Sequence, residues 1–130
     1  MKSALTRTLG AATAAYGVAI LLRPEWLARP CGLPTAPDGS ATAETAPLIR
    51  MVGARDTVIG AAMLCATGDR VRRLATWCRI GSDLGDAVVL GTQLPTGAYR
   101  AKAASVALAW AALNAYSLTA DANSGPGEAA

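Results

Sequence analysis

The sequence predicts an all-α fold, a four-helix transmembrane bundle, on the basis of two observations. Hydrophobic residues make up 52% of the chain and charged residues only 16%, below the roughly one quarter that is usual in soluble domains. Four apolar windows of near-membrane length follow one another, and no alternation of apolar and polar residues indicates a strand. These features favour a multi-pass protein of the cell membrane, surrounded by the lipid bilayer. Because much of the apolar content is alanine, a soluble alanine-rich bundle is the alternative.

The four windows are bounded by residues that begin or end helices. The first, residues 8–22, stops before Arg23-Pro24, because proline ends a helix, and the second, residues 48–67, begins after Pro47. The third, residues 74–94, closes at Pro95, and the fourth, residues 103–120, contains no charged residue. Short connections predict that the last three helices are antiparallel neighbours, whereas the Pro- and Gly-rich segment between the first two is a surface loop.

A chain of 130 residues allows one domain with one core. We expect this membrane domain to cover residues 1–120, and residues 121–130 to form a disordered tail. An inside N-terminus places Lys2, Arg7, Arg70, Arg72 and Arg73 on the cytoplasmic side, five basic residues against four outside. A secretory signal is the alternative for the N-terminus, although no small-x-small cleavage pattern follows the first apolar run.

The composition excludes several classes of function. Because the chain has no histidine, it has no Ser-His-Asp or Cys-His catalytic site, and a zinc site would lack its usual ligands. The three cysteines contain no C-x-x-C pair, so neither a redox motif nor a metal site is indicated, and we expect no cofactor. The net charge of +3 is spread along the chain without a basic patch, which argues against a nucleic-acid partner.

Charged residues interrupt the third window along one helical face. The stripe follows spacings of three, four and seven residues and consists of Thr76, Arg79, Asp83, Asp86 and Gln93. Three central charges cost about 9 kcal/mol on a membrane-insertion scale, whereas the large apolar residues of the window return roughly 4 kcal/mol. The stripe is therefore expected to face other helices or water.

The roughly opposite face of the same window carries mostly small residues, namely Cys78, Gly81, Gly85, Val88 and Thr92. Its G-x-x-x-G spacing permits a close contact with another helix. We expect this face to be the contact surface if the protein forms a homo-oligomer.

The second window offers charged partners for the stripe. Arg55 and Asp56 are adjacent and point about 100° apart on a helix, so one is expected to reach the third helix and the other a different neighbour. Gly53, Asp56 and Gly60 share a face. This arrangement places the carboxylate where a neighbouring backbone or a ligand comes close.

The motif Gly53-Ala54-Arg55-Asp56-x-x-x-Gly60, followed by Asp83-x-x-Asp86, resembles a family of small four-helix bacterial integral membrane proteins of uncharacterised function. The layout of Gly17, Pro24 and Gly32 is also similar, so the likeness covers most of residues 1–120. The resemblance implies a fold and a membrane location but no activity, because the family has none established. It singles out Gly53, Arg55, Asp56, Gly60, Asp83 and Asp86.

One interpretation of the charged residues is structural. Arg55 and Arg79 then neutralise Asp56, Asp83 and Asp86 and hold two helices in register, since buried ion pairs specify an arrangement more than they stabilise it. Such a network fits a non-enzymatic membrane subunit, or a carrier of protons or small molecules.

The other interpretation is catalytic. Because two guanidinium groups face three carboxylates, we expect burial and a like charge one turn away to keep one carboxyl protonated. Asp83 or Asp86 is then the proton donor, and Asp56, positioned by Arg55, is the opposing carboxylate. This chemistry suits an acid-catalysed cyclase or isomerase of secondary-metabolite biosynthesis, acting on an apolar isoprenoid or polyketide. The aromatic residues expected to form the cavity wall are Tyr16, Trp77, Trp110 and Tyr116.

Overall fold

The structure, a computed structural model, describes residues 4–123 and confirms an all-α fold. The described residues form five helices: α1 (Ala4–Leu22), α2 (Glu25–Ala28), α3 (Thr45–Cys65), α4 (Asp69–Gln93) and α5 (Gly97–Asn123). Each of the four predicted windows corresponds to one long helix, although residues 66–67 and 94 lie just beyond the ends of α3 and α4. The short α2 was not predicted. The last helix continues through residues 121–123, the first three residues of the expected disordered tail. The rest of that tail and Lys2 lie outside the described residues.

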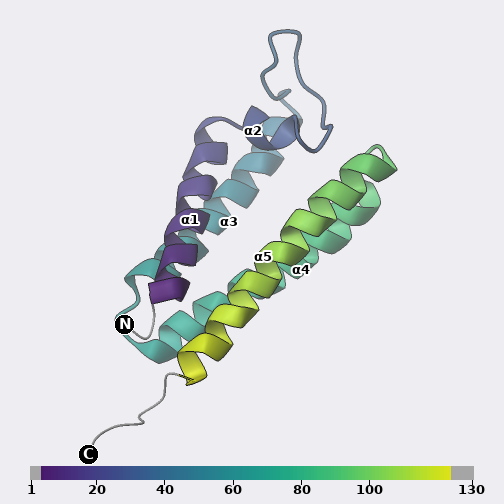
Figure 1. The fold of residues 1–130 in the computed structure, drawn as a ribbon. Helices are drawn as coiled ribbons and strands as arrows, with labels where there is room; N and C mark the ends of the chain where they lie inside the picture. The colour runs from purple at the N-terminus through teal and green to yellow at the C-terminus, as the bar shows by residue number, and fades with distance from the viewer. Residues whose placement is uncertain (1–3, 124–130) are drawn as a thin grey trace, which may run out of the picture.

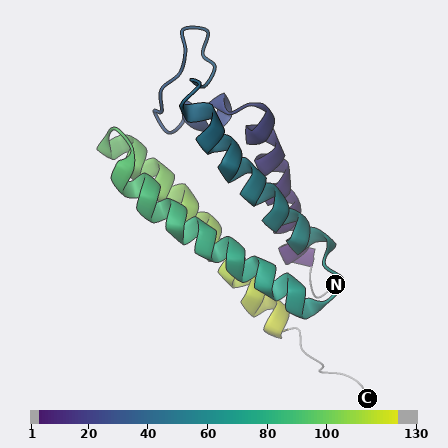
Figure 2. The same cartoon turned by 180° about the vertical axis from the view of Figure 1, so that it is seen from behind.

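The four long helices form two antiparallel hairpins (Figure 1). α1 packs along α3 and α4 packs along α5, whereas the contact between α3 and α4 is smaller. The hairpins meet near the turn from α3 to α4 and diverge toward α2, as both views show (Figures 1 and 2). The last three long helices are consecutive neighbours, as the short connections predict, although α3 packs more extensively on α1 than on α4.

The α1–α3 hairpin is held together by two facing pairs of glycines. Gly17 lies opposite Gly53, and a Cβ built on either glycine would lie 2.7 Å from the backbone oxygen of the other. Gly10 lies opposite Gly60, where a Cβ on Gly60 would lie 2.6 Å from the oxygen of Gly10. The two backbones therefore approach so closely that no side chain fits between them. The motif glycines Gly53 and Gly60 thus have a packing role on α3.

The small-residue face of α4 makes no such contact within the chain. Added Cβ atoms at Gly81 and Gly85 would meet nothing within 4 Å, and Cys78 and Val88 on the same face are exposed. The expected close contact is therefore absent among the described residues. A homo-oligomer through this face stays a prediction.

Different contacts complete the two ends of the α1–α3 hairpin. At the α2 end, Ile20, Ala28 and Ile49 form a buried apolar cluster. At the other end, Arg7 donates to the carbonyl oxygens of Leu64 and Ala66, and Arg72 also donates to that of Ala66, at 2.8 Å. Two arginines thus satisfy carbonyls that the end of α3 leaves without helical partners.

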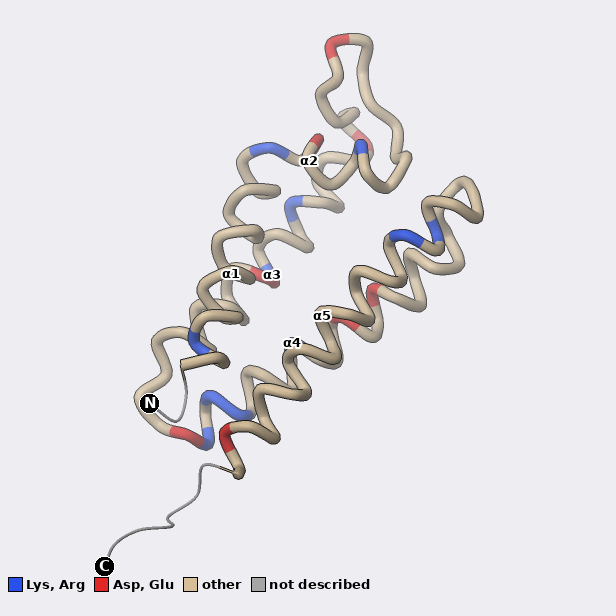
Figure 3. Tube along the Cα trace, in the orientation of Figure 1, with Lys and Arg blue, Asp and Glu red and all other residues tan. Residues whose placement is uncertain are grey.

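Two of the described helices, α1 and α5, are long and apolar enough to cross a membrane. A signal sequence or a buried core helix passes the same test. Burial inside the protein accounts for only 33% of the apolar window of α1 and 22% of that of α5, so most of this apolar surface is left for another environment. Long stretches of both helices carry no charge (Figure 3).

Replacement by alanine should distinguish the glycines packed between α1 and α3 from the exposed glycines of α4 by its effect on stability. Gly60→Ala places a Cβ against the backbone of Gly10 and Ala14, so we expect overpacking to lower the free energy of unfolding by about 1–3 kcal/mol. The matched control is Gly85→Ala in α4, where the Cβ meets nothing and the better helix propensity of alanine preserves or raises stability. Thermal unfolding in detergent measures both variants. Equal melting temperatures would contradict the close α1–α3 contact.

Candidate functional site

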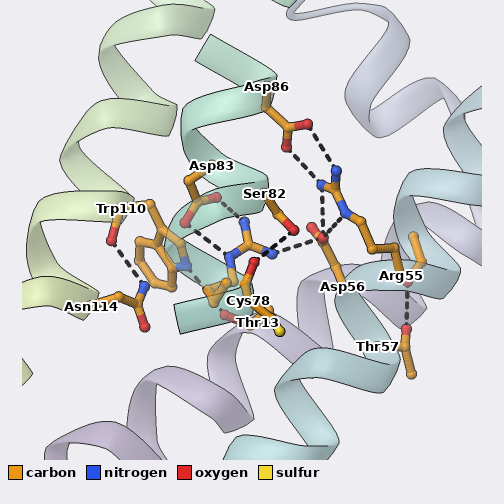
Figure 4. Close-up of polar contacts among 12 residues, drawn as sticks. Thr13, Arg55, Asp56, Thr57, Cys78, Ser82, Asp83, Asp86, Trp110 and Asn114 are labelled. Atoms are coloured by element: carbon orange, nitrogen blue, oxygen red, sulfur yellow. Dashed lines mark hydrogen bonds and ion pairs between the residues drawn. The ribbon is translucent and has the colours of Figure 1, made fainter. Parts of the chain in front are cut away.

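A network of ion pairs joins α3 to α4 midway along both helices (Figure 4). From α3, Arg55 donates two parallel hydrogen bonds to Asp86 on α4, Nη1 to Oδ1 at 2.9 Å and Nη2 to Oδ2 at 2.7 Å. Its Nε and Nη2 also donate to Oδ1 of the adjacent Asp56, at 3.0 and 2.9 Å. One guanidinium group therefore binds a carboxylate on each helix.

Arg79 on α4 likewise binds one carboxylate on each of the two helices. Its Nη1 lies 2.7 Å from Oδ1 of Asp56, which brings this oxygen between the guanidinium groups of Arg79 and Arg55. Its Nε donates to Oδ2 of Asp83 at 3.0 Å, and its Nη2 donates to Oδ1 of the same carboxylate. Asp83 lies one turn further along α4, so these two bonds form within one helix. The five side chains thus form one continuous chain of alternating charge.

Burial divides the network into two parts. The side chains of Asp83, Asp56 and Arg79 are only 2%, 4% and 7% exposed, whereas those of Asp86 and Arg55 are 25% and 32% exposed. Charges taken out of water are tolerated only when they are paired and hydrogen-bonded. The network satisfies this condition by pairing, although it contains three carboxylates and two guanidinium groups.

The structure brings together all five residues that the sequence singled out. One detail of the expectation is wrong: Arg55 and Asp56 do not reach different neighbours, because both pair with residues of α4. The polar stripe of α4 faces inward at Thr76, Arg79 and Asp83 and becomes exposed at Gln93. The stripe emerges from the protein where the two hairpins diverge.

A cavity of about 370 Å³ lies between the hairpins beside the buried part of the network. Asp56, Arg79 and Asp83 form its charged wall, and the opposite wall is largely apolar, with Val106 and Ala107 from α5. This volume falls within the range of small-molecule binding sites in proteins. The network is therefore accessible to a ligand from within the fold.

Two of the four expected aromatic residues line this cavity. Tyr16 from α1 and Trp110 from α5 are in its wall, and the Trp110 indole donates to Oγ1 of Thr13 at 3.2 Å. Trp77 and Tyr116 were expected there and are not. Their side chains are 57% and 63% exposed on the outside of the bundle, because their positions on α4 and α5 lie away from the buried faces.

The sequence did not indicate three other residues of the cavity wall, Leu27, Cys31 and Lys102. The first two come from α2 and the segment after it, which folds back over the space between the hairpins. Burial raises the pKa of the Cys31 thiol, and the nearby Lys102 ammonium opposes only part of this rise. The thiol is thus kept in its less reactive, protonated form. No spacing pattern connects these residues, so sequence periodicity does not identify them.

Among residues 4–123, no group of three or more His, Cys, Asp or Glu side chains is placed to hold a metal ion. The polar groups that line the cavity are carboxyl, guanidinium, hydroxyl, ammonium, thiol and indole groups. These groups bind and transfer protons and stabilise charge.

The model of one protein family, described as a domain of unknown function (DUF4267), matches residues 10–117. The chain belongs to the DUF4267 family. The DUF4267 match begins in α1 and ends in α5, so it includes both hairpins, the network and the cavity. It confirms a family of uncharacterised function, whereas the Gly-Ala-Arg-Asp motif and a bacterial origin stay predictions. No curated protein and no solved structure matches the chain.

Removing either arginine should destabilise this DUF4267 protein, and Arg79 more than Arg55. Arg79→Ala leaves the buried Asp83 without a cationic partner and removes one of the two partners of Asp56, so we expect it to lower the free energy of unfolding by about 3–5 kcal/mol. The loss should be smaller for Arg55→Ala, because Arg55 and Asp86 are partly exposed. Arg79→Lys should restore only part of the stability, since lysine cannot bind two carboxylates through a planar fork.

The matched control for these variants is Arg70→Ala, an exposed arginine on the same helix as Arg79. Thermal unfolding and the yield of monodisperse protein in detergent measure all four variants. If Arg79→Ala melts at the same temperature as Arg70→Ala, the network does not hold α3 against α4.

Proposed function

We propose that the protein is a four-helix membrane domain in which α1, α3, α4 and α5 all cross the bilayer. The apolar length of α1 and α5 supports this proposal directly. For α3 and α4, the support is that their charged side chains pair with each other while large apolar side chains face outward. Val58 on α3 and Leu74 and Val88 on α4 are 68%, 64% and 66% exposed. Exposed apolar surface on this scale is typical of a face that contacts lipid or another protein.

Reporter fusions test this topology. If the four long helices cross the membrane, fusions after Gly68 and after Asn123 lie on the same side, which the basic residues at that end predict to be cytoplasmic. A fusion inserted after Gly39 lies on the opposite side. Finding the fusion after Gly39 on the side of the other two, or most of the protein in the soluble fraction, would refute the topology.

We propose that the cavity binds an apolar small molecule and that Asp83 supplies a proton to it. The observation that carries this proposal is the placement of a buried carboxyl group, hydrogen-bonded to Arg79, in the wall of an otherwise largely apolar cavity. Since the network has one carboxylate more than it has guanidinium groups, retaining one proton makes it neutral. A neutral network costs less to bury than a charged one.

The proposed reaction is an acid-catalysed cyclisation or isomerisation of an isoprenoid or polyketide. Asp83 transfers its proton to an epoxide oxygen or an alkene carbon of the substrate, and a carbocation forms as the C–O bond or the π bond breaks. Tyr16 and Trp110 present aromatic rings that stabilise this cation. The cation closes a ring or shifts a double bond and then loses a proton to the Asp56 carboxylate. The substrate is isomerised without a net change in protons.

A specific observation favours a second candidate, a non-enzymatic membrane subunit or carrier in which the network is structural. Each of the three carboxylates is paired with a guanidinium group, and two of the pairs connect α3 with α4. Such pairing fixes the register of the two helices whether or not a ligand binds. The two candidates differ in what replacement of Asp83 does.

Asparagine substitutions distinguish the two carboxyl groups that the sequence left as equal candidates. Asp83 lines the cavity, whereas Asp86 binds Arg55 at the partly exposed edge of the network. We therefore expect Asp83→Asn to lower the turnover of a linear isoprenoid with a terminal epoxide by about a hundredfold. Asp86→Asn, the matched control, should retain most of the activity. Mass spectrometry of the extracted products measures the conversion.

A cavity-filling pair checks that turnover occurs at this place. Ala107→Leu occupies part of the cavity and should reduce conversion, whereas Ala112→Leu, exposed on the same helix, should not. If the wild-type protein converts none of the epoxide probe, or if Asp83→Asn and Ala107→Leu convert it normally, the acid-catalysis proposal fails. The network is then structural.

A further inference from the structure

A second buried polar feature lies below the cavity, between α1, α4 and α5. It consists of Thr6 and Thr13 on α1, Thr76 on α4, and Asn114 and Ser117 on α5, here called the polar row. The side chains of the row are almost completely inaccessible, with Thr76, Asn114 and Ser117 at 0%, Thr6 at 1% and Thr13 at 3% exposure. This row is separate from the ion-pair network, and the reaction proposed above does not use it.

The polar row connects two spaces. At one end, Thr6 and Thr76 line a polar pocket of about 140 Å³ together with Arg72 and Asp121, near the turn from α3 to α4. Thr6 donates to Oδ2 of Asp121 at 2.9 Å there. At the other end, Thr13 accepts the indole hydrogen bond of Trp110, and both residues line the cavity that contains Asp83. The two ends are about 10 Å apart, judged from the separation of seven positions between Thr6 and Thr13 on α1.

Thr6 and Thr13 bond across helices, whereas the other three residues of the row do not. In membrane bundles, buried hydroxyl and amide groups commonly bond across helices. Here Thr76, Asn114 and Ser117 donate to carbonyl oxygens of their own helices, at 2.9, 2.9 and 2.8 Å. Their acceptor oxygens therefore remain for other partners.

Two polar atoms beside this path are buried without a hydrogen-bond partner among the described residues. They are Oδ1 of the fully buried Asn114 and Nε of Arg72, whose side chain is 7% exposed and lines the polar pocket. Buried polar atoms in proteins are nearly always hydrogen-bonded, and those that lack protein partners bind internal water. Asn114 Oδ1 can accept a hydrogen bond from a water molecule, and Arg72 Nε can donate one. A chain of water molecules needs both kinds of partner.

We propose that the polar row holds water molecules that carry protons between the pocket at Arg72 and Asp121 and the cavity beside Asp83. The role of this path in reprotonating Asp83 rests on the proposed function. Each turnover moves one proton from Asp83 to Asp56, so before the next turnover Asp56 must release its proton to water and Asp83 must take one up. The charged side chains that line the two spaces are Asp69, Arg72, Arg73 and Asp121 at the outer end and Asp56, Arg79, Asp83 and Lys102 at the inner end.

Hydrogen exchange of the Trp110 indole tests the path, because this N–H lies where the row meets the cavity. The protein is labelled with 15N-tryptophan, purified in detergent and transferred to deuterium oxide, and the three indole signals are followed by NMR. Trp26→Phe and Trp77→Phe assign the signals. The wild-type Trp110 indole should exchange, and Asn114→Leu should slow the exchange by about tenfold or more, since leucine fills the same space without binding water.

Ser117→Ala is a milder second variant, expected to slow the exchange in the same direction if Asn114→Leu does not fold. Its matched control is Ser105→Ala, the same change at an exposed position of α5, which should leave the exchange unchanged. The proposal is overturned if the wild-type indole does not exchange over days, or if neither row variant slows it. It is also overturned if only narrowing of the cavity by Ala107→Leu slows it, because water then arrives through the cavity.

The exchange measurement needs no substrate, so it separates the two proposals. If Asp83→Asn retains turnover while the row variants still slow indole exchange, the enzyme proposal fails and the water path stands. If turnover depends on Asp83 while indole exchange is insensitive to substitution of Asn114 and Ser117, the water-path proposal fails and the proposal of acid catalysis by Asp83 is retained.

Discussion

One oxygen of Asp56 holds the two hairpins together, because it lies within hydrogen-bonding distance of guanidinium groups from both Arg55 and Arg79. Glycine contacts join α1 to α3, but α3 and α4 share little packed surface beyond this network and the turn between them. The position of the second hairpin depends on these charge-assisted bonds together with two α1–α5 hydrogen bonds and a small apolar cluster. The hydrogen bonds join Thr6 to Asp121 and Trp110 to Thr13. The two hairpins diverge toward α2 (Figure 1). The cavity is the space that this divergence leaves.

The helical periodicity of α3 and α4 was sufficient to predict most of the network. Charges at three- and four-residue spacing in an apolar helix are too costly to leave in lipid, so their convergence followed from energetics alone. The pairing geometry did not follow. Adjacent residues on an ideal helix diverge, and the long side chain of Arg55 overcame this divergence by folding back over Asp56. Helical periodicity gives the direction in which a Cβ points. The guanidinium group of a long, flexible arginine can lie several ångströms away from that direction.

The catalytic interpretation expected a cavity, but most of its wall and the whole polar row were not predicted, for a related reason. Both depend on how the hairpins are placed relative to each other, and that placement comes from contacts between residues distant in sequence, the α3–α4 ion pairs and the α1–α5 hydrogen bonds. The close approach of α1 to α3 likewise comes from facing glycines. Gly10 and Gly17 were not recognised as partners of Gly60 and Gly53, because each pair consists of residues distant in sequence. The cavity wall and the polar row also include residues that become buried or line the cavity only when the helices pack together, namely Leu27, Cys31, Asn114 and Ser117. Local patterns carry no information about such contacts.

The connection order of the two hairpins, together with the charges of α4, has a consequence for biosynthesis in the membrane proposed above. A helix with Arg79, Asp83 and Asp86 at its centre is a poor substrate for insertion by itself, yet α3, made just before it, already carries Arg55 and Asp56. The first hairpin needs no later segment to close, since its contacts lie within α1 and α3. In the proposed membrane topology, the first hairpin is therefore a template that is made before α4 and already carries partners for its charges. Reversing the order of the two hairpins in the chain would remove that template while leaving every final contact available.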